Sequence, residues 1–131
     1  MRKVFSIMLA IALLLAGCTK PESNNSIKAD NITVFYGFSS YAMSSANQAV
    51  IDGLLNQFNS LCFEKTSEKI DLGSTFYVTF SCNGNSVKSF WVDKNCIFKF
   101  SGETQSYRIS SGSFDYEYLK AVYKYCGKVE N

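Results

Sequence analysis

The chain has 131 residues, with 13 Lys and Arg, 11 Asp and Glu, and no histidine. The lack of histidine excludes a Ser-His-Asp triad, a Cys-His pair and a histidine metal ligand. Arg2 and Lys3 stand in an N-terminal leader, and without them 11 basic residues balance 11 acidic ones. The composition therefore gives no argument for nucleic-acid binding, and no nucleic-acid partner is expected.

The leader combines a positive start with an apolar run. Arg2 and Lys3 precede residues 4–16, a 13-residue stretch that is apolar except for Ser6. As a helix this run would cover roughly 20 Å, which is short of the ~30 Å hydrocarbon core of a bilayer. The pattern predicts an export signal rather than a permanent membrane span.

The end of the run, Leu15-Ala16-Gly17-Cys18, resembles the lipobox of bacterial lipoproteins. The resemblance covers the first 18 residues and implies cleavage between Gly17 and Cys18, with a diacylglyceryl group on the Cys18 thiol. Two acyl chains hold a protein on a membrane far better than one. The resemblance implies a mature protein that is exported and lipid-anchored to the outer face of the cell membrane.

Residues 18–29 are polar, contain the single proline of the chain, and are expected to form a lipidated tether. Removing the leader 1–17 and this tether leaves residues 30–131, about 100 residues, which suits one small domain. We expect this domain to be monomeric.

The first elements of the domain are a strand and a helix. Residues 32–38 are apolar and rich in β-branched and aromatic side chains, which predicts a strand. Ser44 or Ser45 is expected to open a helix, because Ser45-x-x-Gln48 fits a capping box and apolar residues recur at helical spacing up to Leu61. A short strand is expected at residues 61–65.

A β-meander follows, and Asn83-Gly84 is a strong signal for a two-residue hairpin turn after the strand 76–82. A regular hairpin pairs Phe80 with Val87 and Phe76 with Trp91. It places one group of apolar side chains on the core face: Phe76, Val78, Phe80, Val87, Trp91, Phe98 and Phe100. The opposite face would carry Tyr77, Thr79, Lys88, Phe90, Ile97 and Lys99.

The C-terminal part adds a strand at residues 103–109 and a helix from Phe114 to about Tyr125, capped by Ser111 or Ser113 and ended by Gly127. The sequence thus predicts an α+β fold, with an antiparallel sheet of about four to six strands packed on one face by two helices.

Four cysteines remain after Cys18. An even number in a small exported domain predicts disulfides among Cys62, Cys82, Cys96 and Cys126. The hairpin register separates Cys82 from Cys96 by roughly 20 Å, too far for a bond. Two arrangements remain open, Cys62–Cys82 with Cys96–Cys126, or Cys62–Cys126 with two free thiols. Four buried thiols are a third alternative, and without C-x-x-C spacing a metal site is not expected.

Two features suggest a partner surface. Tyr77, Phe90 and Ile97 are predicted to form a row across the second sheet face, which would be a binding surface if exposed and unremarkable if covered by a helix or the tether. Tyr41 lies in the connection between the first strand and the first helix, which is either a recognition loop or a packed, capped connection.

The sequence favours binding over catalysis. It lacks the common nucleophile and phosphate-binding motifs, and no cofactor is expected. A carboxylate-dependent hydrolase stays as an alternative, but Asp115 and Glu117 would point apart on a helix, and Asp71 and Asp93 fit turns.

Within the binding class we expect a small interaction module of the cell envelope with a protein partner. An inhibitor or immunity-type protein against an envelope-acting enzyme is the alternative. The stretch Phe80-Ser81-Cys82-Asn83-Gly84 superficially resembles a hairpin of lipoprotein lysozyme inhibitors, but those are all-β barrels, and the helices expected here depart from that pattern. The domain resembles more closely the small uncharacterised lipoproteins of Gram-positive bacteria.

Overall fold

The computed structural model describes residues 27–37 and 42–126, with side chains as far as residue 124. Seven strands form one antiparallel sheet in the order β2-β1-β4-β5-β6-β7-β3. The strands are β1 (Asn31–Tyr36), β2 (Ala42–Ser45), β3 (Cys62–Thr66), β4 (Phe76–Cys82), β5 (Asn85–Val92), β6 (Phe98–Phe100) and β7 (Ser106–Ser111). The helices are α2 (Gln48–Asn59), α3 (Tyr116–Cys126) and the short 3-10 turn η1 (Leu72–Ser74).

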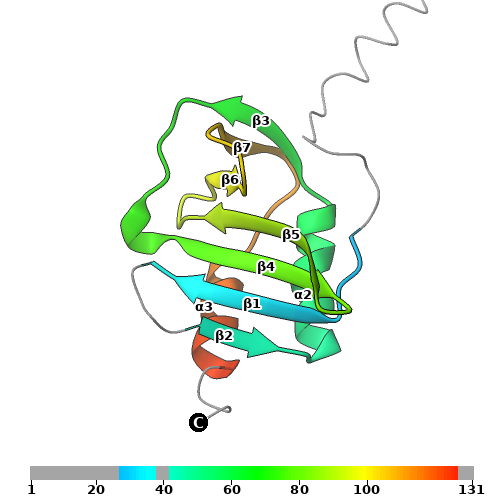
Figure 1. The fold of residues 1–131 in the computed structure, drawn as a ribbon. Helices are drawn as coiled ribbons and strands as arrows, with labels where there is room; N and C mark the ends of the chain where they lie inside the picture. The colour runs from blue at the N-terminus through cyan, green and yellow to red at the C-terminus, as the bar shows by residue number, and fades with distance from the viewer. Residues whose placement is uncertain (1–26, 38–41, 127–131) are drawn as a thin grey trace, which may run out of the picture.

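This architecture confirms the predicted α+β fold. Both helices lie on the same side of the sheet, behind it in the view of Figure 1. The sheet has one strand more than the upper limit expected, because β2 was not foreseen. Ala42–Ser45 is short and polar, yet it pairs along its whole length with β1.

The start of α2 differs from the expected capping box. Ser45 ends β2, and Asn47 is the N-cap, with its side-chain oxygen accepting a hydrogen bond from the Ala49 N–H at 3.0 Å. The Ser45 hydroxyl instead accepts from the Asn47 N–H. Asn and Ser are about equally good N-caps, so pairing of β2 with β1 decides which residue is used.

The register of the β4–β5 hairpin corrects the predicted faces. Asn83 and Gly84 form the expected turn, both with positive φ, and Cys82 pairs with Asn85. The register then shifts between Phe80 and Ser81, so that Phe80 pairs with Lys88 rather than with Val87. A one-residue bulge moves every later side chain to the other face.

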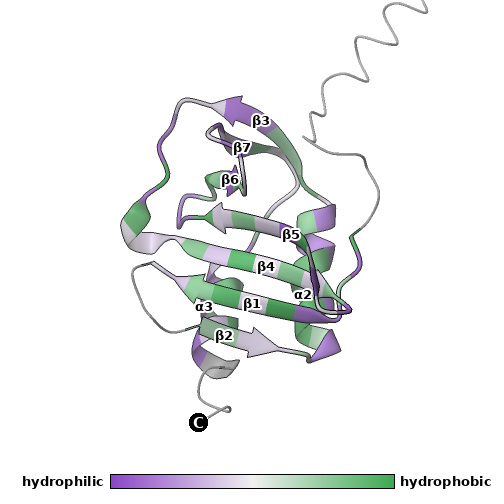
Figure 2. Cartoon of the chain, in the orientation of Figure 1, coloured by the Kyte–Doolittle hydropathy of each residue, from purple (hydrophilic) through white to green (hydrophobic). Residues whose placement is uncertain are grey.

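The core therefore contains the side chains that the regular register would have turned outward. Phe90 is 1% exposed and Val92 is fully buried. Phe90 packs with Phe80 and with Phe58 of α2, whose ring stacks on that of Phe90 at 4.8 Å. Figure 2 shows the alternation of apolar and more polar residues along β1 and β4 as green and paler bands.

The helices run antiparallel to each other. At the start of α3 the Asp115 N–H donates to the side-chain oxygen of Gln57, near the end of α2. One turn later Tyr118 lies over Gly53, where a Cβ would come within 2.8 Å of the Tyr118 hydroxyl. Gly53, a weak helix former, thus allows the close approach of α3. In the described part of the chain, no helix combines the length and the apolar character that crossing a membrane needs.

Candidate functional site

The face of the sheet opposite the helices carries the most distinctive surface of the domain, and we call it the open face. Phe35, Tyr77 and Trp91 lie side by side on β1, β4 and β5, because Phe35 pairs with Tyr77 and Tyr77 with Trp91. We call these three residues the aromatic row. Their neighbours along each strand are mostly buried in the core, so alternation turns the row toward solvent.

The three rings form a continuous apolar strip. The centroids of Phe35 and Tyr77 are 6.5 Å apart, and those of Tyr77 and Trp91 are 4.4 Å apart with the planes inclined by 35°. Phe35 is 40% exposed, and Tyr77 and Trp91 are half-buried by each other and by the strands. Beside the strip lies a hollow of about 210 Å³, lined by Phe35, Gly37, Leu72, Thr75, Tyr77 and Trp91.

A second row of side chains runs parallel to the aromatic row, one pleat away. Thr33 pairs with Thr79, and Thr79 with Ser89, and we call these three residues the hydroxyl row. The hydroxyls of Thr79 and Ser89 are 3.0 Å apart and share a hydrogen bond. The open face therefore places hydrogen-bonding groups next to flat apolar rings.

The hydroxyls also act on Tyr77. Burial raises the pKa of the Tyr77 phenol, but hydrogen bonding with Ser89, Ser101 and Thr79 outweighs this, and the net pKa lies below its ordinary value. The Tyr77 ring packs on Trp91, with hydroxyl groups near its phenol. Aromatic side chains packed in this way lose little conformational entropy when they bind.

The partner surface predicted from sequence is only partly present. Tyr77 lies on the open face as expected, but Phe90 and Ile97 are 1% and 3% exposed and belong to the core. Trp91, assigned to the core, takes the exposed place, because the bulge exchanges it with Phe90. Phe35 was overlooked as an ordinary strand residue. Tyr41 lies outside the described residues.

The described cysteines are of two kinds, disulfide-bonded and free. Cys62 is disulfide-bonded, whereas Cys82 and Cys96 are free thiols, so the pairing Cys62–Cys82 with Cys96–Cys126 is wrong. The alternative partner, Cys126, has a side chain outside the described residues, as has Cys18. Cys62 follows the C-terminal end of α2, and α3 runs from that end toward β2. The direction of α3 therefore carries its last turn away from Cys62.

The acidic residues of the described loops are used in turns. Asp93 is fully buried and accepts hydrogen bonds from the N–H groups of Asp71, Asn95 and Ile97. Asp71 accepts from the Ser74 hydroxyl and the Gly73 N–H, which lower its pKa. Both carboxylates are occupied by local donors, as expected for turn residues. In the described ranges, no three Cys, Asp or Glu side chains are grouped as metal ligands.

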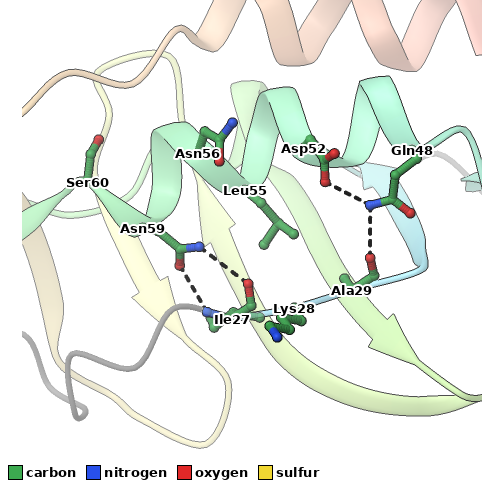
Figure 3. A pocket seen from close by; sticks show the side chains of 9 residues that line it. All are labelled: Ile27, Lys28, Ala29, Gln48, Asp52, Leu55, Asn56, Asn59 and Ser60. Atoms are coloured by element: carbon green, nitrogen blue, oxygen red, sulfur yellow. Dashed lines mark hydrogen bonds between the residues drawn. The ribbon is translucent and has the colours of Figure 1, made fainter.

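A second hollow, of about 610 Å³, lies where the N-terminal segment meets α2 (Figure 3). The side-chain amide of Asn59 accepts from the Ile27 N–H and donates to the Ile27 carbonyl, and Gln48 donates to the Ala29 carbonyl. Ala29 is buried, so residues 27–29 pack with the domain rather than with the expected tether. The side-chain amides of Asn59 and Gln48 bind the main chain of residues 27–29 and so hold the N-terminal segment against α2.

No protein-family model, curated protein or solved structure matches this chain.

Proposed function

We propose that the protein is an exported lipoprotein, anchored through lipid on Cys18, whose domain binds a component of the cell envelope with its open face. The observation that carries the binding part is the aromatic row. Three neighbouring rings on a sheet face, uncovered by either helix, leave apolar area in water that a partner would bury.

The composition of the row suits recognition. Tyr and Trp are enriched where binding energy concentrates, because each offers a large rigid surface with a polar tip. Tyr77 and Trp91 have this character, and the adjacent hydroxyl row can satisfy polar groups of a ligand. Catalysis is less well supported, because Asp71 and Asp93 are engaged by backbone and hydroxyl donors.

The anchoring part rests on the lipobox and has a sharp chemical test. A diacylglyceryl group occupies the thiol of Cys18, so lipidation of that residue and a disulfide through it exclude each other. We expect mass spectrometry of the membrane-bound protein to find an N-terminal diacylated Cys18. Peptide mapping without reduction should then find no bond between Cys62 and Cys18.

The Cys18→Ala variant is the control, and it should appear uncleaved and without the acyl mass. A mature membrane-bound chain with Cys62 linked to Cys18 would refute the lipoprotein proposal, whatever the binding results.

The binding part is tested by sedimentation of the purified protein with isolated cell envelopes. We expect Phe35→Ala and Trp91→Ala to release the protein to the supernatant, because each removes a ring from the strip. Val87→Ala is the matched control, since Val87 is an exposed apolar residue of the same hairpin outside the aromatic row. Equal retention of all variants would contradict the assignment of the open face.

A further inference from the structure

The strands around the aromatic row carry positive side chains and no negative ones. The strands β1, β2, β4, β5 and β6 contain Lys88 and Lys99 and no acidic residue. Lys88 pairs with Phe80 and lies over the ring of Phe100, whereas Lys99 stands between the buried Phe98 and Phe100 and therefore points to the open face. One lysine thus belongs to the open face of these strands.

Lys99 extends the aromatic row by one strand. It pairs with Trp91, so Phe35, Tyr77, Trp91 and Lys99 follow each other across β1, β4, β5 and β6. Within the described part of the chain Lys99 makes no ion pair, while Lys94 is paired with Asp71 and Arg108 with Glu64. The row therefore ends in a cation available to an anionic ligand.

We propose that the open face binds an acidic glycan, with sugar rings on the aromatic row and a uronic-acid carboxylate on Lys99. This proposal rests on the proposed function and names its ligand class. The apolar faces of pyranose rings suit flat aromatic side chains, and their hydroxyl groups suit the hydroxyl row. Strands lie about 4.8 Å apart, comparable to the length of one sugar unit in an extended glycan, so successive units meet successive side chains.

The position of the aromatic row on interior strands favours a glycan over a peptide. A peptide added to this sheet would seek main-chain hydrogen bonds at an edge strand, but β1, β4 and β5 are interior strands whose backbone groups are already paired. Side chains alone remain for recognition on the open face. On β1, β4, β5 and β6 they are rings, hydroxyls and one cation, which match a glycan that carries carboxylates.

Trp91 provides a direct probe, because it is the single tryptophan of the chain. We would titrate the full mature lipoprotein in detergent micelles with oligogalacturonate and record tryptophan fluorescence. The fully methyl-esterified oligomer is the matched ligand, since it keeps the rings and hydroxyls and lacks the charge. We expect saturable binding of both, with the ester weaker by about tenfold, the effect of one lost charged contact.

The variants separate the two components. Lys99→Gln should weaken binding of the acid by about tenfold and leave binding of the ester unchanged, whereas Phe35→Ala should weaken both. Lys88→Gln, a lysine of the same sheet outside the open face, should alter neither. Circular dichroism spectra like that of the wild type would show that the variants fold.

Each outcome decides a separate claim. Equal affinity for acid and ester would overturn the role of Lys99 and leave a neutral glycan as ligand. If neither oligomer changes the Trp91 emission, the glycan proposal fails. Retention on envelopes that still depends on Phe35 would then assign the open face to a protein partner and preserve the proposed function. Loss of both signals would end the proposed binding function as well.

Discussion

At the scale of single residues, Asp93 is the charged side chain that the described part of the domain buries completely. Its carboxylate accepts from three N–H groups, two of them in its own turn and one at Asp71. An N–H deprived of its partner costs roughly 1–3 kcal/mol. We therefore expect Asp93→Ala to lower the free energy of unfolding by about 3 kcal/mol, measured by urea denaturation.

The same experiment has an internal control. Asp52 is exposed and accepts a hydrogen bond from Gln48, so Asp52→Asn should change the stability by less than about 0.5 kcal/mol. If both variants lost the same stability, the contacts of Asp93 would not be what stabilises the loop between β5 and β6.

The cysteines should differ in reactivity. Burial, together with the nearby carboxylates of Asp93 and Asp115, raises the pKa of the Cys96 thiol, and its S–H lies 3.5 Å from the Phe114 carbonyl oxygen. Thiolates are the reactive form. In the native protein we expect iodoacetamide to modify Cys82 before Cys96, and Cys62 only after reduction, as followed by peptide mass spectrometry.

Unfolding in urea is the control for this prediction, because the rates at Cys82 and Cys96 should then converge. Labelling of Cys62 without reduction would contradict its disulfide.

At the scale of elements, the β4–β5 hairpin separates what the sequence predicted from what it did not. The turn at Asn83-Gly84 was predictable, since few residues tolerate positive φ at both positions. The bulge was not predictable, because β5 has apolar residues on both faces. Val87 and Trp91 form one apolar face, and Phe90 and Val92 form the other. Burial against Phe58 of α2 decides between them, and that contact joins residues more than 30 positions apart.

The same distinction holds for the other elements. The helices follow from local periodicity and appear close to where they were predicted. β2 depends on pairing with β1, and its four residues carry no strand signal of their own. The aromatic row was not predictable either, because the register across three strands brings its members together. The same register decides on which face Trp91 lies.

The register can be tested by comparing two substitutions. Phe90→Ala should destabilise the domain by about 3–5 kcal/mol, because it empties a buried site among stacked rings. Trp91→Ala should cost about 1 kcal/mol, because Trp91 is half-buried on the open face. Thermal denaturation measures both. In a regular hairpin without the bulge, Trp91 would be buried and Phe90 exposed, so Trp91→Ala would lose more stability than Phe90→Ala. That result would refute the observed register.

At the scale of the whole molecule, the pH dependence of stability follows from two buried tyrosines whose hydroxyls donate hydrogen bonds. The Tyr116 hydroxyl at the start of α3 donates to the Ser74 carbonyl of η1 at 2.6 Å, and the Tyr107 hydroxyl of β7 donates to Glu103. Burial raises both pKa values above 10.0, and nearby negative charge adds to the effect. Both tyrosines therefore favour the protonated phenol in the folded state.

The sign of the dependence follows by linkage. Below pH 10 the phenols are protonated in both states, and their contribution to stability is fully present. As the pH rises through 10, the phenols ionise first in the unfolded chain, so stability falls until the raised folded-state pKa values are passed. We expect the free energy of unfolding to decrease as the pH rises through about 10 in urea titrations, with phenolate followed by ultraviolet absorbance.

Variants separate these tyrosines from the rest of the molecule. Tyr116→Phe should be less stable at neutral pH, because it loses the bond to Ser74, but its stability should fall less steeply above pH 10. Tyr77→Phe should have the opposite effect on the slope, because the lowered pKa of Tyr77 makes its ionisation favour the folded state. If both variants changed the slope in the same direction, the polar contacts assigned to Tyr77 on the open face would be wrong.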